Sequence, residues 1–363
     1  MSEKRIYEKL SWDFAYNGYM SNERYSHLTQ QVCMAIAQAA YEKPLTPTEI
    51  SITTGIPCMY IEEEIPKLLE FGVLVETDGK YATNFAIYPF ALTQFIRELE
   101  YNAVSNSNLD EIVKVLDKYD AQIRDIGFIG NDRPKNELWW LLIQLLIPKI
   151  ERIAFELSVV KTTYNVPPRK DGYTLICANQ REGNRYEYSC GKHYGSSENG
   201  EKTINYYWSG AKYYSEEINR YLWNTLGNGE FVENISLSPD VDTSVITNVV
   251  LAEGLKYNLI EKTANGSYKW SFMFFSDEQM KSLDILIDQM AREISDLPNT
   301  WAKAISQIDN MYKKSTPKRL HNYVRLFEMS SSKAIVCELF VRDGTLTKSD
   351  SEYLTKSIVV VRK

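Results

Sequence analysis

The sequence predicts an α+β fold that is mainly helical, and three observations support this expectation. Apolar residues recur at helical spacing over much of the 363-residue chain. Two tight-turn pairs, Asp78-Gly79 and Asn265-Gly266, mark hairpins between the helical patterns. Over residues 173–214 the pattern changes to short strand candidates rich in tyrosine. A chain of this length is also expected to contain two or three domains.

The first expected elements are two helices joined by a short loop. Apolar residues at every fourth position predict the first helix over residues 26–42: Leu28, Val32, Ile36 and Ala40. Thr46-Pro47-Thr48-Glu49 then has the pattern of a capping box with proline at the first helical position. The second helix is expected to end near Thr54, where Gly55 suits the left-handed conformation.

A third helix and a hairpin are expected next. Residues 57–71 carry an apolar stripe, and Pro66 within them is expected to cost a hydrogen bond or bend the helix. Residues 73–77 and 80–88 are strand candidates on either side of the Asp78-Gly79 turn. A helix, a capped short helix, a third helix and a hairpin in this order predict a winged helix-turn-helix.

Residues 20–90 resemble winged helix-turn-helix regulators of the broad MarR/ArsR type. They look most like a group of Bacillota regulator-like proteins in which a third helix ending in glycine leads into a segment such as Tyr81-Ala82-Thr83-Asn84-Phe85. The resemblance covers a quarter of the chain and implies a bacterial regulator that binds double-stranded DNA. It brings no catalytic residue with it.

The candidate DNA-binding residues follow from this arrangement. The early third helix would face bases and phosphates, the hairpin tip would supply one lysine, and the N-terminus could add a basic arm. These candidates are Pro57, Cys58, Met59, Tyr60, Glu63, Lys67, Lys80, Lys4 and Arg5.

The charge of this region opposes DNA binding. Residues 1–90 contain 7 Lys and Arg against 12 Asp and Glu, a local net charge of 7 − 12 = −5, and the whole chain carries −7. Glu62 and Glu63 would repel phosphates, although glutamate can accept a hydrogen bond from cytosine. Two functions therefore stay open: a DNA-binding transcriptional regulator, or a winged-helix adaptor that binds proteins and does not contact DNA directly.

A second winged-helix pattern lies in residues 240–275. An apolar helical stripe precedes two strand candidates around Asn265-Gly266. Tyr268, Phe272 and Phe275 repeat the spacing of Tyr81, Phe85 and Tyr88. A fainter echo over residues 333–361 is better explained by a single C-terminal strand that pairs with another sheet.

Long helices are expected between and after these patterns. Residues 106–126 and 136–161 read as helices, and the second is apolar on more than one face, which is typical of burial in a core or between subunits. A homodimer formed through this helical segment is therefore expected. Ser276 begins another capped helix, with helical character to about Lys313 and a break at Pro298. A basic cluster follows at residues 313–325, and it is interpreted either as a solvated helix face or as a phosphate-binding surface.

The central region is expected to be β-rich. Its tyrosines predict ordinary cross-strand packing or an aromatic ligand pocket lined by Tyr186, Tyr188, Tyr206 and Trp208. Taken together, the patterns predict four consecutive segments. These are a winged helix-turn-helix domain (1–90), a helical linker and dimerisation region (91–165), a β-rich aromatic region (166–235), and the second winged-helix pattern with C-terminal helices (236–363).

Several classes of function are not expected. The sequence contains no phosphate-binding glycine loop, dinucleotide fingerprint, HExxH motif or nucleophile elbow, so we predict no enzyme and no cofactor. Cys190 and His193 have a metal-like spacing, but a structural zinc site needs four ligands, so no metal site is predicted. No signal peptide or membrane helix is expected, and five scattered cysteines fit a reducing cytoplasm. The prediction is a cytoplasmic, dimeric regulator with a small-molecule or protein effector.

Overall fold

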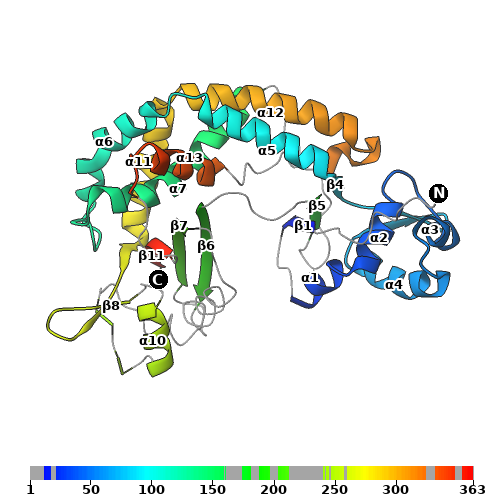
Figure 1. Cartoon of the computed structure of the whole chain (residues 1–363), viewed down its shortest axis with the longest axis horizontal. Coiled ribbons are helices and arrows are strands. Elements are labelled where there is room, and N and C mark those ends of the chain that lie inside the picture. Colours follow the sequence, from blue (N-terminus) through cyan, green and yellow to red (C-terminus); the bar gives the residue numbers. More distant parts are fainter. Residues whose placement is uncertain are drawn as a thin grey trace. The chain divides into compact units, whose positions relative to one another are not determined.

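The computed structural model describes residues 12–17, 22–158, 160, 174–180, 188–196, 203–211, 240–241, 243–244, 247–256, 260–323, 332–347 and 354–362. The fold is mainly helical α+β, as the sequence predicts, with small sheets that are mostly antiparallel (Figure 1). The chain divides into two compact units, and each combines three separate stretches. Unit 1 contains Met1–Leu99, Ser158–Asn184 and Lys303–Glu328, and unit 2 contains Glu100–Leu157, Arg185–Ala302 and Met329–Lys363. The two units therefore interleave along the chain, whereas the sequence predicts four consecutive segments.

Unit 1 begins with strand β1 (Trp12–Asn17) and two short helices, α1 (Asn22–Leu28) and α2 (Gln31–Ala39). The single helix expected over residues 26–42 is therefore wrong, because the chain breaks at Thr29 and Gln30. Thr29 Oγ1 donates to the Ser26 carbonyl at 3.0 Å, and Gln30 adopts an extended conformation before α2 starts. Such local side-chain bonds compete with the helix, and spacing of apolar residues alone does not reveal them.

The next elements of unit 1 are helices α3 (Pro47–Thr54) and α4 (Cys58–Glu70), followed by strands β2 (Leu74–Thr77) and β3 (Lys80–Thr83). Their order confirms the predicted helices and hairpin. Asp78 and Gly79 have φ of 52° and 70°, which is the geometry of the tight turn that joins paired antiparallel strands.

Strand β4 (Ala86–Tyr88) leaves the hairpin, so the single strand expected over residues 80–88 is divided. It pairs in parallel with β5 (Thr174–Gln180), which in turn pairs antiparallel with β1. These three strands form one sheet assembled from distant parts of the chain.

The core of unit 1 collects apolar side chains from these elements. Trp12 of β1 packs edge-on against Phe85 at 6.1 Å between ring centroids, and Leu320 joins the same cluster. Leu320 lies in the 3-10 helix η2 (Lys318–Tyr323). A second cluster packs the start of α5 (Phe90–Ser105) against the end of α12 (Asp296–Ser315) through Tyr88 and Tyr312.

Unit 2 is built around helix α7 (Lys135–Leu157), whose residues Leu138–Leu142 are all buried. It packs against α6 (Asp110–Arg124), α11 (Asp277–Glu293) and α13 (Ser332–Arg342). Figure 1 shows these helices gathered beside the strands of the largest sheet. The apolar faces that suggested a subunit interface are thus occupied within unit 2, and the homodimer stays a prediction.

The largest sheet has the order β10-β11-β7-β6. It contains β6 (Tyr188–Ser196), β7 (Thr203–Ala211), β10 (Phe272–Ser276) and β11 (Leu354–Arg362). The C-terminal strand therefore pairs with a sheet, as expected.

Helix α10 (Asn248–Lys256) precedes the hairpin of β8 (Ile260–Lys262) and β9 (Tyr268–Trp270). The order of elements repeats that of unit 1: a helix, a hairpin, a third strand and a long helix. In both units the third strand pairs in parallel with a strand from later in the chain, β4 with β5 and β10 with β11. On its other side, β5 pairs antiparallel with β1, and β11 pairs antiparallel with β7.

Helix α11 begins with the predicted capping box, because Ser276 and Gln279 exchange hydrogen bonds at 2.9 and 3.1 Å. The expected helix break at Pro298 is wrong. The chain breaks earlier, at Ile294 and Ser295, and Pro298 lies in the first turn of α12. Proline is tolerated there because the first turn lacks internal acceptors for its amides.

Candidate recognition surface and a buried His-Cys-Glu cluster

Local hydrogen bonds fix both ends of α3. Thr46 Oγ1 accepts from the Glu49 amide at 3.2 Å, and Glu49 Oε2 accepts from the Thr46 amide at 2.8 Å. Gly55 has φ of 70°, and Ser51 Oγ donates to the Ile56 carbonyl at 2.7 Å. The left-handed Gly55 and the Ser51–Ile56 bond set the direction in which α4 leaves α3.

The outer side of α4 is exposed and acidic. Ile61, Ile65 and Leu68 are buried, which turns the opposite side of the helix to solvent. Pro57, Met59, Tyr60, Glu62 and Glu63 are all exposed, and Cys58 is partly exposed, 3.6 Å from Glu62 Oε1. The structure therefore brings the predicted recognition residues to one accessible helix.

Positive charge on this surface is sparse. Lys67 lies 3.5 Å from Glu23 and 6.0 Å from the centre of the Phe71 ring, so it is partly engaged within unit 1. Lys80 is exposed on the hairpin. Lys4 and Arg5 of the expected basic arm lie outside the described residues.

Apolar side chains are exposed on the same module. Met59 is 60% exposed, Tyr60 52%, Ile52 of α3 78% and Val75 of β2 40%. Single exposed apolar residues are ordinary, but four on three neighbouring elements are a feature of protein-binding surfaces.

Some members of the basic cluster at residues 313–325 already have partners within the protein. The Arg319 guanidinium donates to the carbonyls of Ala40, Tyr41 and Thr83, so it ties η2 to α2 and β3. Lys313 pairs with Asp309 at 2.7 Å. The Arg319 guanidinium is therefore engaged with backbone carbonyls instead of being available for a phosphate. Arg325 lies outside the described residues.

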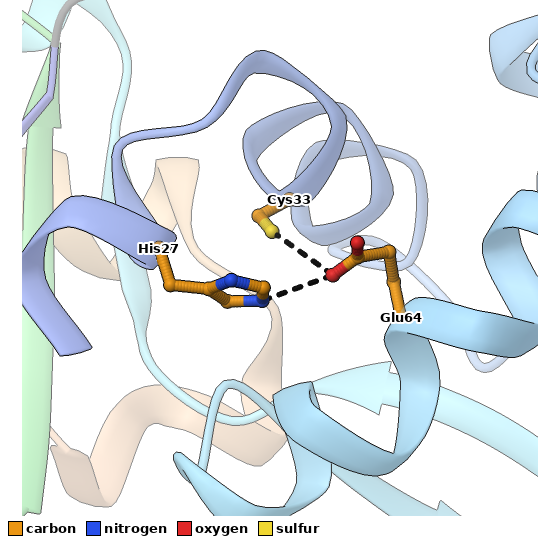
Figure 2. A group of neighbouring side chains, drawn as sticks. All are labelled: His27, Cys33 and Glu64. Atoms are coloured by element: carbon orange, nitrogen blue, oxygen red, sulfur yellow. Dashed lines mark hydrogen bonds and ion pairs between the residues drawn. The ribbon is translucent and has the colours of Figure 1, made fainter. Parts of the chain in front are cut away.

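Three side chains from three helices meet beneath α4. His27 of α1, Cys33 of α2 and Glu64 of α4 converge, with their ligand-type atoms all within 4.8 Å of one another (Figure 2). His27 Nε2 lies 2.9 Å from Glu64 Oε2, and Cys33 Sγ lies 3.7 Å from the same oxygen. Among the described residues this is the group with a metal-like ligand set.

Most of the cluster is buried. The side chains of His27 and Glu64 are 11% and 27% exposed, and Cys33 is buried. The His27–Glu64 contact is short but is not aligned as a hydrogen bond. Burial, together with the carboxylate of Glu64, raises the pKa of the Cys33 thiol to about 12.

The sequence did not reveal this cluster, because its members are separated along the chain and nothing in their spacing joins them. The helical patterns alone could have placed two of the three residues near the core. Cys33 falls among the buried residues of its helix, and Glu64 lies beside the apolar positions of α4.

The predicted aromatic pocket is only partly described. Tyr188 lies in β6, and Tyr206 and Trp208 lie in β7, but their side chains and all of Tyr186 fall outside the described part. Unit 2 has a pocket of about 440 Å³ elsewhere, beside β8 and β9. Its lining includes charged residues, among them Asp132, Arg133, Glu137, Glu261 and Lys269.

Comparison with known proteins adds no assignment: no protein-family model, curated protein or solved structure matches the chain. Within the described residues, none of the helices has both the length and the apolar character needed to cross a membrane.

Proposed function

We propose that this chain is a DNA-binding transcriptional regulator whose recognition module is a winged helix-turn-helix formed by α2, α3, α4 and the β2–β3 hairpin. The observation that carries the proposal is the capped turn between α3 and α4, which presents the outer side of α4 to solvent. A helix held in this way can enter a major groove, and the hairpin can contact the adjacent backbone.

The chemistry of the surface suggests a particular kind of DNA contact. The N-terminal end of α4 carries partial positive charge, which favours a phosphate near Cys58 and Met59. Glu63 can accept a hydrogen bond from cytosine, and Lys80 can meet the backbone. With so few cations, affinity should depend only weakly on salt, with a logarithmic slope of roughly −2 or shallower.

The proposal also includes a homodimer in the cytoplasm, because two modules related by a two-fold axis match paired half-sites. An effector would bind outside the recognition module, and the pocket beside β9 is the candidate place for a small molecule.

Selection of bound genomic fragments followed by gel shift tests this function. We expect a specific shift at about 50 mM salt that weakens when Lys80 is replaced by glutamate. A Lys262→Glu variant, at the end of β8 in the second hairpin, is the matched control. If no fragment shifts specifically at low salt, DNA binding by this chain is wrong.

A second candidate function, protein binding by the same surface, is favoured by the exposed apolar residues Ile52, Met59, Tyr60 and Val75 next to an acidic helix. In this case the winged helix would act as an adaptor that docks on a basic, partly apolar partner. Replacing Met59 and Tyr60 by alanine should then abolish co-purification of that partner from the host. Ile285→Ala, at an equally exposed position of α11, should leave it unchanged.

A further inference from the structure

We propose that His27, Cys33 and Glu64 form a binding site for a divalent transition metal of the zinc type. The site contains none of the candidate DNA-contacting residues, and neither function discussed above requires it. It rests on the convergence of three metal-binding side chain types in one shielded place (Figure 2).

The geometry is close to that of a metal centre. Zinc bond lengths of about 2.0–2.3 Å to nitrogen, oxygen and sulfur imply ligand–ligand separations of roughly 3.3–3.8 Å in a tetrahedron. Cys33 Sγ lies 3.7 Å from Glu64 Oε2, within that range. His27 Nε2 lies 2.9 Å from the same oxygen, so a bound ion would push these two atoms apart by about half an ångström. All the ligand-type atoms lie within 4.8 Å of one another, so no pair would have to close by more than about 1.5 Å.

The ligand set selects the class of metal. Thiolate and imidazole favour Zn²⁺ and its neighbours such as Co²⁺, whereas Mg²⁺ and Ca²⁺ prefer sites made of oxygen atoms. Two of the ligands, a thiolate and a carboxylate, together neutralise a divalent ion. Three protein ligands leave a fourth position for water or for a further donor.

Metal binding would change the state of two of these side chains. The ion would accept a lone pair from the His27 imidazole, which lies 2.9 Å from Glu64 Oε2. It would bind Cys33 as the thiolate, and the thiol proton would pass to solvent.

The position of the site gives metal binding a structural effect. Its ligands come from α1, α2 and α4, so a bound ion would cross-link α4 to α1 and α2. Glu64 directly follows Glu63, which is exposed on the outer side of α4. If the proposed DNA-binding function holds, metal binding would then stabilise the orientation of the recognition helix.

Cobalt titration of the purified, metal-stripped full-length protein tests the site without any DNA. We expect one equivalent of Co²⁺ to produce a sulfur-to-cobalt charge-transfer band and the visible bands of a tetrahedral centre. Excess Zn²⁺ should remove both. Cys33→Ser should abolish the charge-transfer band, whereas Cys58→Ser, at the partly exposed cysteine of α4, should keep it.

A second variant distinguishes loss of the metal site from misfolding, which the substitution of the buried Cys33 could also cause. Glu64 is partly exposed, so Glu64→Gln should keep the helical circular dichroism of the parent. It should nevertheless bind Co²⁺ at least about tenfold more weakly. Absence of the charge-transfer band in the parent protein, or parental affinity in Glu64→Gln, would overturn the proposal. Because neither readout involves DNA, these results are independent of the gel-shift experiment.

Discussion

Glu151 is a partly buried acid whose ionisation opposes folding. It lies on α7, and the Ser332 hydroxyl of α13 donates to its carboxyl group. Burial raises the pKa of this carboxyl from 4.5 to about 7, although Ser332 and the charge of Lys333 act in the opposite direction. Between these two values the folded protein binds more protons than the unfolded chain. The free energy of unfolding should therefore fall as pH rises from about 4.5 to about 7, and level off above that.

Replacing Glu151 by glutamine should remove this penalty. We expect Glu151→Gln to stabilise the protein at pH 8 by on the order of 1–3 kcal/mol and to have little effect at pH 5. Urea unfolding at the two pH values measures the difference. Glu156→Gln, on the exposed side of the same helix, is the control and should show no such dependence. Equal effects of the two substitutions would contradict the assignment.

At the scale of single elements, the start of α3 depends on one capping box. Thr46→Ala removes the hydroxyl that accepts from the Glu49 amide. We expect this change to cost about 1 kcal/mol in the free energy of unfolding, because a first-turn amide of α3 loses its partner. Thr48→Ala, at an exposed position in the same turn, should cost much less. Thermal or urea unfolding of the two variants provides the comparison.

The Arg319 side chain joins two parts of unit 1 that are distant in sequence. Arg319→Ala leaves the carbonyls of Ala40 and Thr83 without this donor. A loss on the order of 1 kcal/mol is expected, since the guanidinium is only partly buried. Arg319→Lys should not rescue stability, because a single ammonium cannot span several carbonyls. Lys318→Ala, at the exposed neighbour, should be neutral in the same unfolding measurement.

Sequence reasoning succeeded where the signals are local. The capping residues at Thr46 and Ser276, and the turn pairs at Asp78 and Asn265, specify backbone geometry within a few residues. It failed where the outcome depends on distant partners. The sequence near Ala86 does not predict that β4 pairs with β5 instead of extending the hairpin. The reason is that β5 lies on the order of 90 residues further along the chain. The metal-like cluster was missed for the same reason.

At the scale of the whole molecule, the two compact units are assembled from stretches that are distant in the sequence. Composition and motif spacing describe consecutive stretches, and they predict a domain that ends at residue 90. Unit 1 instead takes β5 from the middle of the chain and η2 from its last quarter. Pairing and burial across such distances leave no mark on local composition, so the sequence could not show them.

A fragment of residues 1–90 should therefore not fold as the full chain does. It lacks β5, which pairs with both β1 and β4, and it lacks Leu320, which belongs to the core cluster of unit 1. We expect the fragment to lose cooperative thermal unfolding, as followed by circular dichroism. Fluorescence of Trp12 offers a second readout, because no other tryptophan falls within the residues of unit 1. A fragment that unfolds cooperatively at the midpoint of the parent protein would contradict this expectation.

The late arrival of Leu320 and Arg319 also matters for protein synthesis. Phe85 leaves the ribosome on the order of 230 residues before Leu320, which is a delay of roughly 10–50 s at ordinary rates of translation. During that time the first module has its helices and hairpin but not its last core residue or the guanidinium that ties α2 to β3. Nascent chains of this protein should therefore depend on chaperones until Leu320 has left the ribosome, and chains that terminate before it should be degraded.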